Sequence, residues 1–255
     1  MNLLLFDNRE RQGDVLRLND RRAEHILTVL RLKVGDRLRV GEVNGGQGTG
    51  VIRKIDAPCV ELEVELNTPL PAEPEITLVL ALPRPIMLKR ILKQATTLGV
   101  KRFHLIRTRR VEKSFYHSPV LKPENIREVL LLALEQAMAT RLPEVHVHKQ
   151  FKPFVEDVLP SLPGTRLLAH PGAPLNLHDL MAPEQQTGKK EDRQDGSVLL
   201  AVGPEGGFVD YECERFMEQG FTAFSMGRRI LHVDTAVVAL LAQIQLLMVA
   251  SSSYP

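Results

Sequence analysis

Two glycine-containing segments near the C-terminus hold the residue types that could do chemistry. The first is GPEGGF at 203–208, which follows the apolar run at 197–202. The second is MGRRILHVDTA at 226–236, which follows another expected strand. Glycine directly after a strand and before a helix exposes backbone at the edge of a parallel sheet where ligands bind. Loops at consecutive strand ends would lie side by side, so the sequence predicts one pocket with a wall from each.

The spacing of the first segment does not fit a phosphate loop. A P-loop ends in Gly-Lys followed by Ser or Thr, whereas Phe208 follows the last glycines here, and the dinucleotide fingerprint needs a different glycine spacing. The carboxylate of Glu205 would also repel a phosphate at close range. Glycines allow close backbone approach, and a carboxylate suits a cationic ligand or one with N–H groups. The alternative is a tight turn in which Glu205 faces the dipole of the next helix.

Basic residues are concentrated between residues 84 and 113. Ten lysines and arginines fall in this stretch against one acid, Glu112, although the whole chain has a net charge of only +2. Such a field suits an anionic partner such as a nucleic acid. A solvated helix face with some loop charges is the alternative that composition leaves open.

Composition indicates a globular protein. The 255 residues are 44% hydrophobic, which suits one large domain or two modest ones. Cys59 and Cys213 lie far apart with no metal-ligand spacing, so we expect neither a disulfide nor a metal site. The N-terminus lacks a basic stretch followed by a long apolar one, and the longest apolar run, 236–250, is too short to span a bilayer. We therefore expect a soluble cytoplasmic protein with no membrane partner.

The N-terminal part must form a small β module. Residues 1 to about 70 contain the short strands LLLFD, RLRVGEV, GVIRKI and CVELEVEL, with period-two alternation in the last, and the helical pattern AEHILTVLRL between the first two. This combination predicts a β-barrel-like domain. The proline-rich stretch at 67–75 is the expected linker.

The remaining chain alternates strands with helices and must position both glycine segments. Such alternation predicts a mostly parallel sheet covered on both faces. Residues 182–196 contain no large hydrophobe and are expected to be a solvated loop. The expected strands are 76–82, 102–108, a strand near Val145, 165–170, 197–202 and 221–226. The expected helices are 87–99 with Gly99 as its C′ residue, 122–140, a helix near Phe154, 210–219, and one capped by Asp234 or Thr235 that ends near Ala250.

At these residues the sequence resembles the SPOUT class of S-adenosylmethionine-dependent RNA methyltransferases. Within that class it resembles the RsmE family, which methylates N3 of a uridine in the decoding region of 16S rRNA. The pattern Leu-Gly-x-Arg-Ile-Leu-Arg-x-Glu-Thr-Ala of that family corresponds to 226–236, and GPEGGF precedes it by about twenty residues. Similarity continues in order along nearly the whole chain, in HILTVLRLKVGD, ALPR, LKQATTLGV, TRRVEKSF and EQAMATRLP.

The resemblance implies an architecture, a cofactor and partners. Residues 1–70 would form a PUA-like RNA-binding β-barrel, and residues 71–255 a SPOUT methyltransferase domain, an α/β parallel sheet with a C-terminal trefoil knot. The protein would be a homodimer that acts on the 16S rRNA of the small ribosomal subunit. The cofactor, S-adenosyl-L-methionine, would lie in the knot and be held largely by backbone groups. The matching positions are Leu168, Ala169, His170, Val202, Gly203, Glu205, Gly206, Gly207, Met226, Gly227, Arg229, Ile230 and Leu231.

The implied chemistry assigns roles within the same segments. N3–H of uridine is a weak acid, so the site must stabilise negative charge that develops on the base and hold the methyl group in line. Arg229 is the first candidate for that task and Arg228 the second. His232 is either a general base or a filler of space, and Glu205 either touches the ligand or braces the turn. The RNA-binding candidates are Arg31, Arg84, Lys89, Lys93, Arg107, Arg110 and Arg141.

Some positions depart from the pattern of the family. Arginine is usual where His232 and Ala139 stand, and glutamate is usual at Thr97, Arg109 and Asp234. Asp234 keeps the negative charge of the usual glutamate. The charged residues that are absent are therefore two arginines, at His232 and Ala139, and two glutamates, at Thr97 and Arg109. We hypothesise that these four positions formed one charge network in relatives and lost it as a unit. The departures keep two alternatives open, a non-catalytic RNA-binding or assembly protein and a SPOUT methyltransferase with another RNA target.

Overall fold

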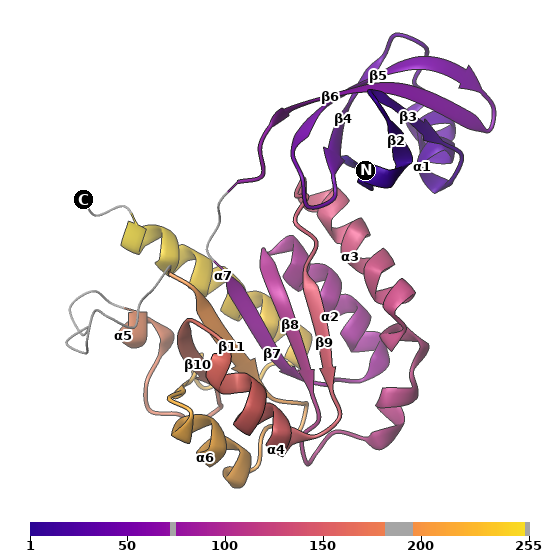
Figure 1. The fold of residues 1–255 in the computed structure, drawn as a ribbon. Coiled ribbons are helices and arrows are strands. Elements are labelled where there is room, and N and C mark those ends of the chain that lie inside the picture. Colours follow the sequence, from indigo (N-terminus) through magenta and orange to yellow (C-terminus); the bar gives the residue numbers. More distant parts are fainter. Residues whose placement is uncertain (72–74, 182–195, 253–255) are drawn as a thin grey trace. The chain divides into compact units, whose positions relative to one another are not determined.

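The computed structural model describes residues 1–71, 75–181 and 196–252, and most of the expected solvated loop therefore lies outside the described residues. By contacts the chain divides into two compact units (Figure 1). Unit 1 comprises Met1–Ala72 and Leu131–Leu142, and unit 2 comprises Glu73–Leu130 and Pro143–Pro255. The domain boundary expected at residue 70 stays a prediction.

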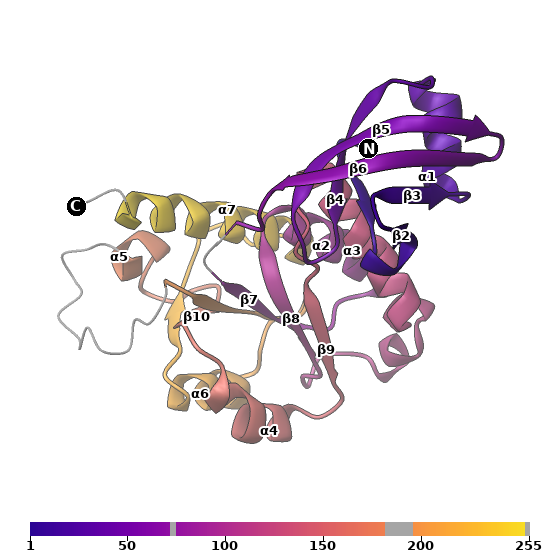
Figure 2. The same cartoon turned by 45° about the horizontal axis from the view of Figure 1, so that its top comes forward.

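Unit 1 is built on a curled six-stranded sheet of order β1-β4-β5-β6-β3-β2 (Figure 2). The first pair, β1 with β4, is parallel and the other pairs are antiparallel. Alternate residues of β6, Val60, Leu62 and Val64, are buried in its core, as period-two alternation predicts. The strands are β1 Leu4–Phe6, β2 Arg11–Gln12, β3 Val15–Leu18, β4 Arg37–Glu42, β5 Gln47–Asp56 and β6 Cys59–Thr68.

The helix expected between β1 and β4 is present. Asp20 caps α1 (Arg21–Glu24) by accepting a hydrogen bond from the backbone N–H of Arg22 at 2.9 Å. The helix continues as a π-helical turn over His25–Leu30. Arg31 ends that turn with a φ of 54°, a left-handed conformation that is uncommon outside glycine. Sequence reasoning did not identify β2, β3 or the short 3-10 helix Asn8–Glu10.

A second chain segment, Leu131–Leu142, belongs to unit 1. It includes the end of α3 (Pro123–Ala137), where Leu134 packs with Leu3 and Leu5 in a small buried cluster. The carbonyl of Glu135 accepts a hydrogen bond from the N–H of Leu3 at 3.1 Å, and its buried carboxylate pairs with Arg21 at 2.7 Å. The core of unit 1 is therefore completed by residues that the sequence analysis had assigned to the second domain.

Unit 2 contains a six-stranded sheet in which every pair of neighbours is parallel, which confirms the predicted α/β class. The strand order is β12-β10-β11-β7-β8-β9, so the chain builds one half outward from β7 and then returns to build the other half. Ligands of such sheets bind at the carboxyl ends near this reversal. The strands are β7 Ile76–Ala81, β8 Val100–Ile106, β9 Glu144–His148, β10 Thr165–Ala169, β11 Val198–Val202 and β12 Thr222–Phe224.

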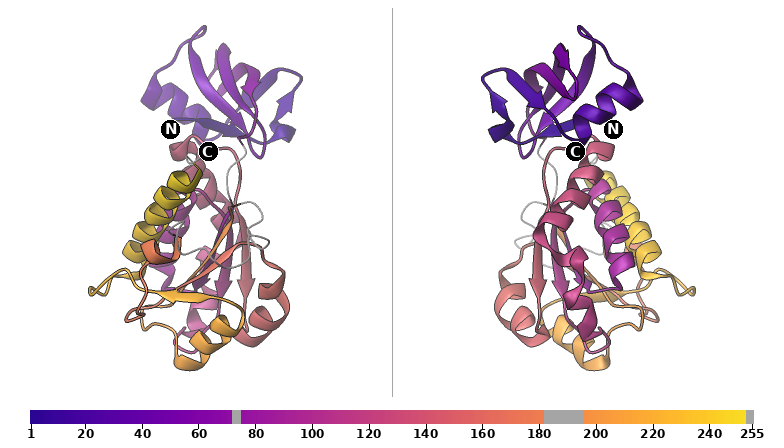
Figure 3. Two further views of the ribbon diagram at one scale, coloured as in Figure 1. Left: turned by 90° about the vertical axis from the view of Figure 1, so that its left-hand side faces the viewer. Right: turned by 90° about the vertical axis from the view of Figure 1, so that its right-hand side faces the viewer.

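Helices cover both faces of this sheet (Figure 3). Two of them, α2 and α7, lie side by side on one face, and α4 and α6 lie toward the other (Figures 1 and 3). The rings of Phe151 in α4 and Phe216 in α6 meet edge to face at 5.6 Å. The helices are α2 Pro85–Thr97, α4 Phe151–Pro153 with the π-helical turn Phe154–Val158, α5 Leu177–Met181, α6 Asp210–Glu218 and α7 Val233–Ser252. Short 3-10 helices span Lys113–His117, Pro119–Leu121 and Leu159–Ser161.

Helix boundaries show one clear error of the sequence analysis. The last helix begins at Val233, so neither Asp234 nor Thr235 caps it, and both lie in its first turn. By contrast, Gly99 follows α2 with a φ of +80°, as expected of a C′ residue.

Within the described ranges, no helix combines the length and the apolar character needed to cross a membrane. The trefoil knot stays a prediction.

Candidate functional site

A pocket lies at the carboxyl ends of β10, β11 and β12, within unit 2. Its empty space is about 740 Å³, the open mouth included. Its walls come from the ends of these strands, from the first turns of α7 and from two loops. We call residues 203–208 the glycine loop and residues 227–232 the arginine segment.

Small residues are required where the glycine loop folds back on itself. A Cβ atom on Gly203 would lie 3.1 Å from the backbone nitrogen of Phe208, which is tighter than nine in ten real Cβ contacts. Gly207 has a φ of +74°, and its N–H donates to the carbonyl of Pro204 at 2.7 Å. The turn directs Phe208 into the interior, where it is 4% exposed and packs against Phe216 with ring centres 5.2 Å apart. The loop is thus a tight turn anchored by a buried aromatic ring.

Residues from the ends of β7 and β8 hold the glycine loop from outside. The guanidinium of Arg110 donates a hydrogen bond to the carbonyl of Gly206. A carboxylate oxygen of Glu205 accepts from the backbone N–H of Arg84 at 3.4 Å. Both open interpretations of Glu205 receive support, because it contacts a neighbouring loop and also lines the pocket.

Glu212 is a supporting residue that sequence reasoning missed. It is 3% exposed, and one oxygen accepts from the N–H of Arg109 at 2.6 Å while the other accepts from the N–H of Val209 at 3.0 Å. A carboxylate that accepts hydrogen bonds from backbone N–H groups is well satisfied despite burial. The available signal was an acidic residue in the first turn of the helix that follows the glycine loop.

The end of β10 forms another wall. The N–H of His170 donates to the carbonyl of Phe224 at 2.9 Å, which joins the ends of β10 and β12. The Nδ1 atom of His170 lies 3.7 Å from the Sγ atom of Cys213 on α6. Burial, reinforced by the acidic neighbours Asp210 and Glu212, raises the pKa of the Cys213 thiol, which therefore stays protonated near neutral pH.

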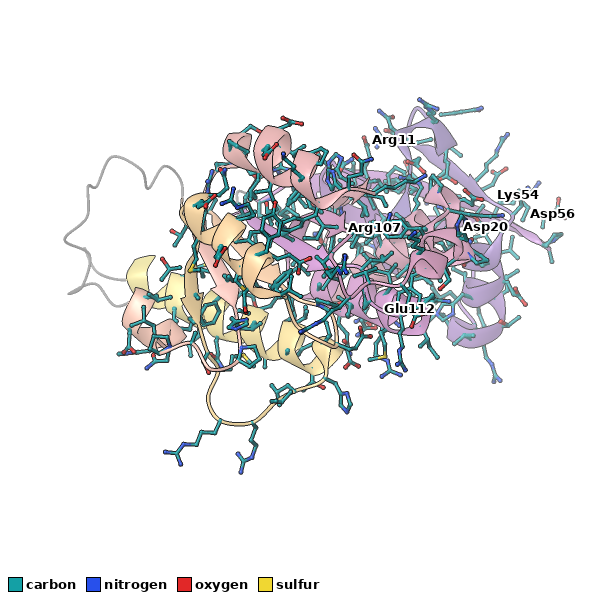
Figure 4. The ribbon with its side chains drawn as sticks, turned by 90° about the horizontal axis from the view of Figure 1, so that it is seen from below. Arg11, Asp20, Lys54, Asp56, Arg107 and Glu112 are labelled. Carbon is teal, nitrogen blue, oxygen red and sulfur yellow. The ribbon has the colours of Figure 1, made fainter. Side chains whose placement is uncertain are left out.

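The arginine segment has a different character. It is preceded by Ser225, whose Oγ atom accepts from the N–H of Gly227 at 3.0 Å. All its residues are exposed, and the side chain of Ile230 is 83% exposed although it lines the pocket. In Figure 4 the segment is the loop that leaves the body of the protein beside α7, with nitrogen-tipped side chains directed outward. The side-chain carboxylate of Asp234, just beyond it, pairs with Arg90 of α2 at 3.0 Å.

Most of the predicted cofactor positions come together at this pocket. Leu168 is fully buried behind it, and Gly206 lies beside it under Arg110. The predicted positions that line it are Ala169, His170, Val202, Gly203, Glu205, Gly207, Met226, Gly227, Arg229, Ile230 and Leu231. Lining residues that the sequence analysis did not name are Pro171, Pro204, Phe208, Phe224, Ser225, Val233, Ala236 and Leu240.

The candidate catalytic residues separate into two pairs. Arg229 and Glu205 line the pocket, and within the described residues they are its only arginine and its only acid. Arg228 and His232 are exposed in the same segment and are not lining residues. The carbonyl of His232 accepts from the N–H of Ala236 at 2.8 Å in the first turn of α7.

The described residues hold no group of three or more His, Cys, Asp or Glu arranged for a metal ion.

The basic candidates of unit 2 lie at two places. Arg84, Lys89 and Lys93 are exposed on α2 or immediately before it. Arg107, labelled in Figure 4, and Arg110 follow the end of β8. The side chain of Arg110 donates a hydrogen bond to the carbonyl of Gly206 in the glycine loop, so its guanidinium is partly engaged within the protein.

Unit 1 carries the other two basic candidates. Arg31 is exposed at the end of the π-helical turn, and Arg141 is half-buried in the second chain segment of that unit. The RNA-binding role of the seven residues stays a prediction.

The structure separates two of the four positions in the hypothesised charge network. Thr97 ends α2 and precedes β8, whereas Arg109 follows β8. The seven residues of that strand separate the two positions by roughly 20 Å. The Thr97 hydroxyl donates to the carbonyl of Lys93 at 3.0 Å, and Arg109 contacts Glu212 through its backbone. Thr97 and Arg109 therefore do not contact each other directly, and a network of all four positions stays a prediction.

Comparison with known proteins matches both parts of the chain. Residues 71–245 match the family model described as an RNA methyltransferase domain, and residues 18–65 match that of an RNA methyltransferase PUA domain. Together with the parallel sheet and its pocket, these matches define an RNA methyltransferase. They confirm the predicted class of enzyme and the PUA-like nature of the N-terminal part.

Individual relatives narrow the family. The ribosomal RNA small subunit methyltransferase E of Treponema pallidum is 32% identical, over 94% of this chain and 88% of its own length. The protein of the same name from Synechocystis is 31% identical over 88% of this chain and 70% of its own. The chain belongs to the ribosomal RNA small subunit methyltransferase E family.

Solved structures show the same fold. The crystal structure of the Neisseria gonorrhoeae ribosomal RNA small subunit methyltransferase E, bound to S-adenosyl methionine, superposes with a TM-score of 0.75. It is 21% identical and covers 96% of this chain and 98% of its own. A probable rRNA methyltransferase from Porphyromonas gingivalis gives a TM-score of 0.73 at 25% identity, over 98% of this chain and 100% of its own.

Proposed function

We propose that this protein uses S-adenosyl-L-methionine to methylate N3 of a uridine in the 16S rRNA of the small ribosomal subunit. Membership of the ribosomal RNA small subunit methyltransferase E family supports the rRNA substrate. The S-adenosyl methionine bound by the Neisseria gonorrhoeae relative supports the choice of cofactor. The observation that carries the proposal is the composition of the pocket, whose only described acid is Glu205 and whose only described arginine is Arg229. A carboxylate suits the sulfonium cation, and an arginine suits the negative charge that develops on the base.

The residues of the pocket fit this cofactor. The backbone of the glycine loop offers hydrogen-bonding groups at close range, since Gly203 and Gly207 carry no side chain of their own. Phe208, Val233 and Leu240 supply apolar walls for an aromatic base. The cofactor supplies an electrophilic methyl group when it is bound.

The protein residues would orient the two reactants and stabilise charge. The guanidinium of Arg229 stabilises the uracil oxygens as N3–H loses its proton, and Arg228 is the second candidate for that role. The glycine loop fixes the geometry of the bound cofactor against the base. His232 is either a general base or a filler of the space of the arginine usual in the family.

The proposal extends to assembly and partners. We propose a homodimer, which is supported by exposed apolar side chains on three elements of unit 2, Ile86 of α2 at 74%, Leu246 of α7 at 69% and Ile230 at 83%. The basic candidates would contact rRNA phosphates in the cytoplasm. The trefoil knot is supported by the path of the chain, because α7 packs on α2 although β12, which precedes α7, is at the far edge of the sheet.

Two measurements test the proposed function together. The first is titration of the protein with S-adenosylmethionine by calorimetry. The second is mapping of modified nucleotides after reaction with small subunits from a strain that lacks this enzyme. We expect binding and one new N3-methyluridine, and loss of the product in Arg229→Ala. The matched control is Lys152→Gln, which removes an exposed cation of α4 that does not line the pocket.

Other outcomes point to the alternatives. Binding of rRNA without binding of S-adenosylmethionine would indicate a non-catalytic assembly protein. Methylation at a different nucleotide would indicate a different RNA target. Turnover that is unchanged in His232→Gln would remove His232 as a general base.

A further inference from the structure

The arginine segment is fastened at its two ends. Before it, the N–H of Ser225 donates to the carbonyl of Leu175 at 2.8 Å. After it, the chain enters α7. Within the described part of the chain, residues 228–231 make no hydrogen bond, so their position depends on the elements that flank them.

The first turns of α7 form part of the pocket. Val233 and Ala236, three residues apart on one side of the helix, line it, and Leu240 extends the same wall. Any rotation or sliding of α7 would move this wall and the end of the arginine segment together. The contacts that fix α7 therefore bear on the shape of the pocket.

Two polar contacts fix α7 against α2. Near the start of α7, the Asp234 carboxylate accepts from the guanidinium of Arg90 at 3.0 Å. Eleven residues later, the side-chain amide of Gln245 donates to the carbonyl of Leu98, the residue that ends α2, at 2.5 Å. The first contact lies at the pocket end of α7, and the second at the opposite end of α2.

The Arg90–Asp234 pair differs from an ordinary surface ion pair. The Asp234 side chain is only 12% exposed, while that of Arg90 is 55% exposed. The second carboxylate oxygen of Asp234 accepts a hydrogen bond from the N–H of Thr235 at 3.0 Å. Removal of Arg90 would leave a largely buried carboxylate with one hydrogen bond, whereas removal of the carboxylate would leave an arginine that water can solvate. The two changes are therefore not equivalent.

We infer that Arg90 and Asp234 are a pair of positioning residues that fix the pocket wall of α7 and the end of the arginine segment for cofactor binding. The inference rests on the proposed function, because it takes the pocket as the site of S-adenosylmethionine. Neither residue lines the pocket. The pair acts through Val233, Ala236 and the segment that carries Arg229.

A double-mutant cycle tests the inference in the full-length protein. The variants are Arg90→Gln, Asp234→Asn and both together, with S-adenosylmethionine affinity measured by calorimetry. We expect affinity about tenfold weaker in Arg90→Gln and about threefold weaker in Asp234→Asn. The double variant should match Asp234→Asn, because the two residues act through one contact. Asp234→Glu, which keeps the carboxylate, should bind within about twofold of the parent.

Limited trypsin digestion gives a readout that does not need the cofactor. Arg228 and Arg229 are exposed cleavage sites within the arginine segment. Cleavage there should be faster in Arg90→Gln than in the parent at a temperature well below the melting temperature of both proteins. Lys152→Gln, which breaks an exposed ion pair with Glu156, is the control and should change neither cleavage nor affinity.

The outcomes separate this inference from the proposed function. If the parent binds S-adenosylmethionine and all variants bind and are cleaved like the parent, the positioning role is wrong and the proposed function stands. If Arg90→Gln weakens binding of rRNA alone, Arg90 is an RNA contact and the inference is wrong. If the parent binds no S-adenosylmethionine, the proposed function and the inference both fail.

Discussion

The glycine loop and the arginine segment line the same pocket but are held in opposite ways. The glycine loop is held by Arg110, Glu212 and the buried ring of Phe208. The arginine segment is fully exposed and is fastened only at its ends. The pocket therefore combines a wall whose geometry exists before the ligand arrives with one whose side chains can adjust, an arrangement suited to a small cofactor followed by a large substrate.

The largest expected effect is the loss of the ring that anchors the glycine loop. Phe208→Ala should cost about 3–5 kcal/mol of the free energy of unfolding, since it empties a buried site, and should lower the melting temperature by about 10 °C. S-adenosylmethionine affinity should fall as well. Tyr211→Ala removes a ring from the same region that is 51% exposed, and calorimetry should show a loss below about 1 kcal/mol. Equal losses would contradict the view that the glycine loop is anchored by burial.

The next effect concerns the carboxylate that joins the glycine loop to the end of β8. In Glu212→Gln the amide N–H₂ would face a backbone N–H, so we expect a loss of about 1.5–3 kcal/mol in chemical denaturation. Glu214→Gln, an exposed neighbour on α6, is the control and should have little effect. A melting curve unchanged by Glu212→Gln would show that the two hydrogen bonds of Glu212 do not stabilise the loop.

Acidic pH should lower the stability of the half of the sheet that contains β8 and β9, since the residues after β8 support the glycine loop. Burial lowers the pKa of His104 on β8 to about 3, and burial also lowers that of His148 on β9. In the unfolded chain these two histidines take up protons near pH 6.5, whereas in the folded protein they do so only at lower pH. Their contribution to the free energy of unfolding is therefore complete above pH 6.5 and declines as the pH falls toward 3. Between pH 6.5 and pH 5 we expect a loss of about 2 kcal/mol from His104. His104→Phe should flatten this slope and the exposed His117→Gln should not; equal slopes would contradict the assignment.

The smallest effect on stability belongs to the arginine segment. Ile230→Ser should change the free energy of unfolding by less than about 0.5 kcal/mol, because the side chain is 83% exposed. If the segment closes over the cofactor, affinity should fall by about tenfold through lost apolar burial. Val29→Ser, an exposed apolar residue of unit 1, is the control. Unchanged affinity would indicate a segment that stays open when the cofactor binds.

The sequence predicted the parts of the fold that depend on local patterns. Continuous apolar runs identified the buried strands β7 and β11, and glycine after a strand identified both pocket loops. The close approach of the glycine-loop backbone to a ligand stays a prediction. The resemblance then supplied the family, which the comparisons confirm.

Contacts between distant residues could not be predicted in the same way. Glu212 meets the backbone of Arg109 across 103 residues of sequence, and no local pattern marks that contact. Leu240 reaches the pocket because it follows Ala236 by about one turn on α7, which depends on where that helix packs. Because α7 starts at Val233, Asp234 lies within the first turn of the helix and pairs with Arg90 instead of capping the helix. A shift of one or two residues in the helix boundary therefore changes the role of Asp234.

The two-part composition of unit 1 has a consequence for protein synthesis. Leu3 and Leu5 are buried with Leu134, and Leu3 is bonded to the backbone of Glu135. A nascent chain emerges N-terminus first, so the first 72 residues must wait for the segment 131–142 before their core is complete. An isolated N-terminal fragment would leave these leucines uncovered, and the N-terminal part of this enzyme is therefore not a module that can be transplanted by cutting after residue 72.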